Sequence, residues 1–406
     1  MIVILPIILF VLIYLPYLFL IPGGDGNLEF SLAVSMFQGT FFTHHLIFHP
    51  PFKLFLFTLF FPYFGYWSYS LVGLILGCFG IYALFEIAEE IFNKKIALLS
   101  SFLLAVSGLY IAVGQPSIND FVMTVMILIA FMFYLRGNYW WYGIFAAIAV
   151  LTKETAIFFA VSIIAVELFQ KKKHFIPLFL PVISLVLWLA FLHVTGRELW
   201  NDYNFSSTKD KGSMYTILHN LVTFGFFNKY AAENWLHLFV FNFNWVYTFF
   251  AGIGLFSIKY AKQKKALAVI GIFYLLFVTG VLGFQTWTIN RYVLPLLPFL
   301  YLFAIVGASR LRYHAVWLTI IFACALLSLS SSIDPVSKLF WPRTTILGEK
   351  IFIYKTDGGD GITYNLQYLN LLKKRTAMLS SGQCKMPYLL SYDKDTLKLL
   401  QIKTCR

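Results

Sequence analysis

Charged residues are scarce in this chain of 406 residues, at 12% of the total, where ordinary soluble domains carry about 25%. Cysteine is also rare, because four residues are too few for the disulfide framework of a small scaffold. Hydrophobic residues make up 60% of the chain and aromatic residues 19%. A single globular core cannot hide that much apolar surface. The composition therefore excludes a soluble enzyme and a disordered chain, and it predicts a polytopic membrane protein.

Uncharged runs of the length that crosses a bilayer punctuate the first three quarters of the sequence. The first run lacks the short apolar region and cleavage site of a signal peptide, so we expect it to remain as a helix. About eleven transmembrane helices are expected, over residues 2–21, 68–88, 96–113, 121–135, 139–152, 155–170, 176–194, 235–257, 266–283, 292–308 and 315–331.

Basic residues fall in alternate connections between these runs, which predicts their orientation. Short Lys/Arg-rich turns face the cytoplasm, so the N-terminus is expected inside and residues 332–406 outside. The net charge of +13 then reflects topology, and no nucleic-acid partner is expected. The basic connections contain Lys94 and Lys95, Arg136, Lys171 to Lys173, Lys259 to Lys265, and Arg310 with Arg312.

The chain divides by composition into two expected domains. Residues 1–331 form an all-α membrane module whose first outer loop contains an aromatic stretch, 52–64, typical of an interfacial helix. Residues 332–406 have a soluble composition, with strand-like segments at 351–354 and 388–392 and a helical segment at 364–379. We expect a small extracytoplasmic α/β appendage.

Two carboxylates are expected on the outer face. Asp25 lies between glycines just after the first run, and ionisable groups beside a membrane segment are functional by default. Alternatively, Asp25 caps a short helix starting at Gly26, with Glu29 near its first turn. Asp120 opens the fourth run, where an N-cap role explains it equally well.

Cations are expected on the same face. Lys153 and Glu154 lie between the fifth and sixth runs, and Arg291 and Tyr292 open the tenth. Such cations commonly anchor span ends at the interface. Alternatively, they bind a phosphate group at the bilayer surface.

Histidines in the first outer loop raise the alternative of a metal site. His45 and His49 could join Asp25 around a divalent ion, but their spacing matches no closed zinc signature. No cofactor is therefore assigned, and a divalent metal remains an alternative.

Four motifs occur in order along the chain. Asp25 is followed by the segment from His49 to Lys53, and Gln115 to Asp120 come next; the last two motifs are Leu151-Thr152-Lys153 and the run from Arg291 to Pro298. Over about residues 1–310, this pattern resembles the GT-C fold membrane glycosyltransferases, in the branch of protein mannosyltransferases and aminoarabinose transferases. It departs from that branch at Gly26, where relatives have an acid, and at His49, where many have Lys.

The resemblance implies an inverting glycosyltransferase of the plasma membrane that uses a polyprenyl-phosphate sugar and a lipid, glycan or protein acceptor. Asp25 would be the general base, and Asp120 would orient the acceptor or the sugar or assist the base. The donor phosphate would contact Lys153, Arg291, His49 and Lys53. Weaker acceptor or sugar contacts would come from Glu29, His45, Glu154 and Tyr292. Two alternatives remain open, a polysaccharide polymerase or ligase and a transporter or flippase.

Overall fold

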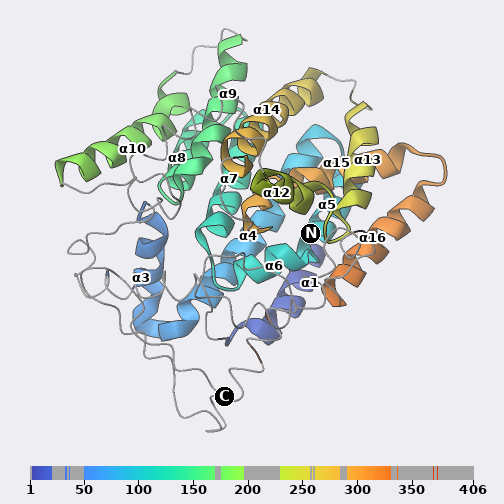
Figure 1. Ribbon diagram of the computed structural model, residues 1–406, viewed down its shortest axis with the longest axis horizontal. Coiled ribbons are helices and arrows are strands. Elements are labelled where there is room, and N and C mark those ends of the chain that lie inside the picture. Colours follow the sequence, from blue (N-terminus) through green and yellow to red (C-terminus); the bar gives the residue numbers. More distant parts are fainter. Residues whose placement is uncertain are drawn as a thin grey trace.

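The computed structural model describes residues 2–20, 50–169, 175–195, 229–256, 261–283 and 290–330, with isolated positions 33, 36, 258, 336, 369 and 373. Every element in these ranges is helical (Figure 1). The strands expected at 351–354 and 388–392 lie outside the described residues. The described residues are therefore all-α as expected, whereas the division into two domains and the α/β appendage stay predictions.

The N-terminal elements follow their local sequence closely. Helix α1 (Ile4–Tyr14) tightens into a 3-10 turn at Leu15–Tyr17, because Pro16 lacks the amide hydrogen that an α-helix interior requires. Helix α3 (Phe52–Phe64) has the bounds expected for the interfacial helix. Gly65 ends it with a positive φ of 52°, a conformation that glycine adopts without steric cost. A 3-10 turn (Gly65–Trp67) then leads into α4 (Ser68–Ile91).

Two expected spans are bent helix pairs instead of straight helices. Helices α5 (Lys94–Ala105) and α6 (Gly108–Gly114) meet at 59°, because Ser107 caps α6 by accepting a bond from the Tyr110 amide. Helices α12 (Lys229–Phe239) and α13 (Asn244–Phe256) meet at 73°.

The remaining elements complete the bundle. They are α7 (Asn119–Leu135), α8 (Tyr139–Val150), η4 (Glu154–Ala156), α9 (Ile157–Phe169), α10 (Phe175–Val194), α14 (Ala261–Phe277), a π-helical turn η5 (Val278–Leu282), η6 (Asn290–Val293), α15 (Leu297–Arg310) and α16 (His314–Ser330). In the described part of the chain, three helices are long and apolar enough to cross a membrane, or five if each bent pair is one span. The other apolar helices are shorter, so the expected number of eleven is not reached by length alone.

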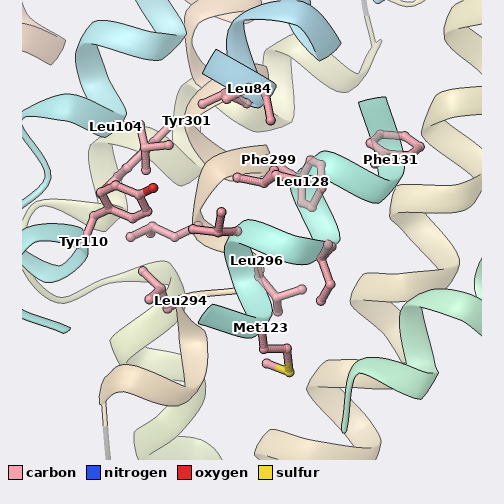
Figure 2. Packing of buried hydrophobic residues seen from close by; sticks show 14 of the residues in the cluster. Leu84, Leu104, Tyr110, Met123, Leu128, Phe131, Leu294, Leu296, Phe299 and Tyr301 are labelled. Carbon is pink, nitrogen blue, oxygen red and sulfur yellow. The ribbon is translucent and has the colours of Figure 1, made fainter. Parts of the chain in front are cut away.

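Helix α7 lies at the centre of the bundle and packs against α4 and α8, while α10 covers the far side of α8 (Figure 1). Buried side chains converge around α7 from several elements, as Figure 2 shows for Leu84, Tyr110, Phe131 and Phe299. Helices α13 and α15 approach so closely that a Cβ atom on Gly254 would lie 2.2 Å from the Phe303 carbonyl oxygen. Small residues allow such backbone contact between membrane helices.

Polar contacts join the helix ends that the basic residues predict on the cytoplasmic side. Arg136 after α7 pairs with Glu86 of α4, and Lys265 of α14 lies 2.5 Å from the Glu167 carboxylate of α9. These helix ends therefore lie together at one end of the bundle. Because α7 begins and α8 finishes at the opposite end, that end carries the remaining ionisable candidates.

Candidate functional site

Asp120 is the second residue of α7 and is 1% exposed. Ile118 occupies the N-cap position, without a side-chain cap, so the interpretation of Asp120 as an N-cap residue is wrong. Instead, one carboxylate oxygen accepts a 2.6 Å hydrogen bond from Lys153 Nζ. The other lies 3.2 Å from Arg291 Nε. Both oxygens thus face cations, and the carboxylate is a counter-ion shared by Lys153 and Arg291.

Lys153 follows the end of α8 and points into the protein, with 5% exposure. Thr152 closes the preceding helix by donating its hydroxyl to the Ile148 carbonyl at 2.9 Å, after which the backbone of Lys153 is extended. An interfacial anchor would reach the lipid headgroups instead. The anchor interpretation of Lys153 is therefore wrong.

The η6 turn supplies Arg291 and Tyr292 together. The Tyr292 ring centroid lies 4.5 Å from Lys153 Nζ and 5.3 Å from Arg291 Cζ, distances at which an aromatic face attracts a cation. The Arg291 side chain is only 11% exposed. The Tyr292 ring and the Asp120 carboxylate therefore each contact both cationic side chains, Lys153 and Arg291, and restrict their positions.

Lys53 brings the first outer loop to this cluster. Its helix begins beside the Lys153 turn, because the Phe52 amide donates to the Leu151 carbonyl at 3.1 Å. The Lys53 side chain is 1% exposed, with Nζ 5.6 Å from the Phe57 ring centroid. Burial and the nearby Lys153 charge hold the pKa of Lys53 well below its ordinary value, although Asp120 opposes them.

Lys153 titrates in the opposite direction. Burial opposes its charge, but the Asp120 carboxylate, assisted by Tyr292 and Glu154, outweighs burial and raises the pKa of Lys153. Lys153 therefore stays charged at neutral pH, whereas an anion bound nearby would oppose the lowering of the pKa of Lys53.

The cluster is defined as Lys53, Asp120, Lys153, Arg291 and Tyr292. Among the described residues, the Lys153 and Arg291 side chains contact the Asp120 carboxylate, and the buried Lys53 side chain is close enough to feel its charge. Charges interact more strongly in such a buried setting than in water. Arg and Lys are the side chains that bind phosphate groups, by fork-like bonds and by point charge respectively. The arrangement suits an anionic group at the bundle end.

Several predicted site residues lie outside the described residues, namely Asp25, Glu29, His45 and His49. Their roles and the metal alternative stay predictions. Within the described ranges, no group of three or more His, Cys, Asp or Glu side chains is placed to hold a metal. Glu154, the remaining candidate, is half-buried next to Lys153.

Sequence reasoning did not single out the uncharged polar residues that join α1, α4 and the turn before α7. Tyr14, Ser70 and Gln115 are fully buried and hydrogen-bonded to one another or to backbone carbonyls. The signal was available, because each is a polar side chain within or at the edge of an apolar run.

Comparisons with known proteins agree with this architecture. Residues 48–196 match the model of the dolichyl-phosphate-mannose-protein mannosyltransferase family. By sequence alone, no curated protein matches the chain.

Solved structures share the fold at low sequence identity. ArnT from Cupriavidus metallidurans, bound to undecaprenyl phosphate, has a TM-score of 0.57 and 16% identity, over 93% of this chain and 78% of ArnT. An Archaeoglobus fulgidus oligosaccharyltransferase in complex with Zn and sulfate has a TM-score of 0.53 and 14% identity, over 80% of this chain and 52% of its own. AglB from the same organism, with an inhibitory peptide and a dolichol-phosphate, has a TM-score of 0.50 and 15% identity, over 93% and 55%. The predicted resemblance to the GT-C fold is confirmed.

Proposed function

We propose that this chain is a membrane glycosyltransferase that moves a sugar from a polyprenyl-phosphate carrier to an acceptor hydroxyl or amine, with inversion at the sugar C1. The observation that carries the proposal is the buried ion cluster, in which Asp120 holds Lys153 and Arg291 beside Lys53. The GT-C fold supports it, because the ArnT structure contains undecaprenyl phosphate and the AglB structure a dolichol-phosphate.

The reaction breaks the bond between the sugar C1 and a phosphate oxygen and forms a bond from C1 to the acceptor. Asp25 takes the acceptor proton, and the polyprenyl phosphate leaves. Negative charge grows on the departing phosphate in the transition state. That charge is stabilised by Lys53, Lys153, Arg291 and His49. Loss of one of these contacts would slow sugar transfer by a factor of about 10²–10³.

Asp120 is assigned a supporting role in this mechanism. With a cation on each oxygen, its carboxylate orients Lys153 and Arg291 toward the phosphate. Tyr292 restricts the same two cations, and Glu29, His45 and Glu154 contact the sugar or the acceptor.

The proposed enzyme is a multi-pass protein of the plasma membrane. Residues 1–331 form the catalytic module with a cytoplasmic N-terminus, and residues 332–406 form an extracytoplasmic domain. Outside the cell nucleotide sugars are scarce, so a lipid carrier that enters from the bilayer supplies the donor. The acceptor is a lipid, a glycan or a protein.

The test incubates purified protein in lipid nanodiscs with a panel of radiolabelled polyprenyl-phosphate sugars and a membrane extract as acceptor, with and without EDTA. We expect wild type to consume one donor and release polyprenyl phosphate, and Asp25→Asn to release none. A fully active Asp25→Asn variant would contradict the assignment of the base. In sealed vesicles containing the same protein, movement of an unconsumed donor across the bilayer would identify a flippase instead.

A further inference from the structure

Two turns at the predicted cytoplasmic end of the bundle carry exposed cationic side chains. One turn joins α4 to α5, and the other joins α15 to α16. We call this set of side chains the basic patch; it consists of Lys94, Lys95, Arg310 and Arg312.

Both turns lie at the end of the bundle opposite the ion cluster. Helix α15 follows η6, which supplies Arg291 to that cluster, so α15 finishes away from it. Helix α4 finishes beside the start of α14, where the Gln263 amide donates to the Ile91 carbonyl at 3.2 Å. Helix α5 packs along α15, and the Phe92 ring just before α5 has its centroid 6.4 Å from that of the Phe303 ring. The two turns are therefore neighbours.

The charge of the basic patch is not balanced by the acids of this end. Glu86 and Glu167 pair with Arg136 and Lys265, and the ion pairs between described residues include no side chain of the patch. Neither α5 nor α16 has an acidic residue in its first turn, although acids are favoured there. An exposed acid, Glu89, lies in the last turn of α4. Four cations therefore leave this surface positive.

An apolar face continues from the patch along α16. This helix lies at the edge of the bundle, against α13 and α15 (Figure 1). Val316, Ile320 and Leu327 are 54%, 38% and 54% exposed, and their spacing places them on one face of the helix. In a membrane-spanning helix such a face contacts acyl chains. The surface thus presents charge next to an apolar face, in the order in which a phospholipid has its phosphate and its chains.

The turn between α15 and α16 has a fixed shape. Tyr313 has a φ of 65°, a left-handed conformation that persists in a residue other than glycine where neighbouring contacts enforce it. One such contact is the Trp317 indole, which donates to the Arg312 carbonyl at 3.0 Å. The Arg312 guanidinium carbon lies 5.1 Å from the centroid of the Tyr313 ring, which is 64% exposed. Tyrosine rings favour the membrane interface, so this contact holds the Arg312 charge at headgroup depth.

We propose that the basic patch binds an anionic phospholipid of the cytoplasmic leaflet, with its phosphate on Arg310 and Arg312 and its acyl chains along α16. Arginine binds phosphate oxygens through fork-like hydrogen bonds, whereas Lys94 and Lys95 contribute point charges. Each basic residue close to an anionic membrane surface strengthens binding about fivefold. This lipid site lies apart from the donor cluster and does not depend on sugar transfer.

The test measures binding of phosphatidylglycerol to the purified full-length chain in detergent by native mass spectrometry, with phosphatidylcholine of the same acyl chains as the neutral comparison. Arg312→Gln removes one charge of the patch, and Arg312→Lys keeps it. The matched control, Arg136→Gln, removes an arginine of the same end that pairs with Glu86. A further variant, Arg291→Met, reports whether the lipid occupies the donor cluster instead.

We expect wild type to prefer phosphatidylglycerol and Arg312→Gln to bind it about fivefold more weakly. Arg312→Lys, Arg136→Gln and Arg291→Met should bind it as wild type does. Equal wild-type affinity for the two lipids, or equal losses in Arg312→Gln and Arg136→Gln, would overturn the proposal. A loss confined to Arg291→Met would also overturn it, because the lipid would then bind at the donor cluster.

Discussion

At the scale of single residues, Asp120 shows how the site differs from a stabilising ion pair. Burying charges costs several kcal/mol per ion, and an apolar replacement of a buried ion pair is often as stable. The contacts of Lys153 and Arg291 with Asp120 therefore contribute little to stability for their cost. The cluster instead holds its positively charged side chains in position in advance, so they need not rearrange when an anion binds.

Removing the Asp120 charge tests this interpretation against a matched pair elsewhere. Asp120→Asn removes the negative charge that Lys153 and Arg291 share, so we expect a loss of stability of about 3–5 kcal/mol and transfer at least 10²-fold slower. Glu167→Gln removes a carboxylate with 1% exposure that pairs with Lys265 at the other end of the bundle. It should lose similar stability and keep its transfer rate. Thermal unfolding and initial rates per folded protein check both; equal rate losses would contradict a specific role.

Lys53 gives the site a pH dependence. Its pKa is held well below the ordinary value by burial, and a bound phosphate would raise it. At a pH between the pKa of Lys53 in the free protein and its pKa with phosphate bound, binding takes up a proton. The affinity for phosphate should therefore fall as pH rises, by at most tenfold per pH unit. Polyprenyl monophosphate binding measured from pH 7 to 10 should show this fall. Lys53→Arg, whose side chain stays protonated throughout, should bind independently of pH. A flat wild-type profile would contradict the prediction.

The sequence predicts which residues form the cluster better than it predicts how their side chains contact one another. Motif order and the alternation of basic turns place Lys53, Asp120, Lys153 and Arg291 at one end of the membrane module. From the sequence, Asp120 could equally be a helix cap and Lys153 an interfacial anchor. Sequence position alone does not show whether a charged group at a helix end faces solvent or the protein interior.

At the scale of elements, the helix ends place the cluster. The first turn of α7, the turn after α8, the η6 turn and the start of α3 converge, and each contributes one charged side chain. Asp120 in the first turn of α7 also complements the positive end of that helix. The helices thus provide rigid supports for side chains that must hold their geometry.

Close packing of α13 on α15 supports η6, which precedes α15. A Cβ atom on Gly254 would lie 2.2 Å from the Phe303 carbonyl oxygen, whereas one on Gly252 would meet nothing within 4 Å. Gly254→Ala should therefore separate the helices and destabilise the protein by about 1–3 kcal/mol. Gly252→Ala should leave the melting temperature unchanged or raise it, because alanine favours helix. Thermal unfolding of both variants checks the contact, and equal shifts would contradict it.

The apolar runs predicted where helices occur, but they did not predict where two of the expected spans bend. The run 96–113 reads as one span, yet Ser107 starts a new helix within it. In the run 235–257, Asn242 and Phe243 adopt positive φ values of 55° and 64°. At the first break Ser107 contacts another helix through a 3.0 Å bond with Tyr301. At the second break the Asn244 amide donates to the His237 and Leu238 carbonyls. Hydropathy along the chain contains neither contact.

At the scale of the whole molecule, the two ends of the bundle differ in how their charges are used. At the predicted cytoplasmic end, Arg136 pairs with Glu86 and Lys265 with Glu167. The opposite end concentrates Lys53, Lys153 and Arg291 around Asp120. A donor that is anchored in the bilayer and presents its phosphate at that surface would meet this positive field.

The most direct test of the phosphate site is the affinity of the intact protein in nanodiscs for polyprenyl monophosphate, compared with polyprenol of the same chain length. We predict that wild type prefers the phosphate. Arg291→Met should weaken phosphate binding about tenfold to a hundredfold, since a charged hydrogen bond contributes about 1.5–3 kcal/mol. Arg136→Met, which alters the pair with Glu86 at the other end, should bind as wild type does. Equal wild-type affinity for polyprenol and its phosphate, or an Arg291→Met variant that binds phosphate as tightly as wild type, would contradict the proposed donor site.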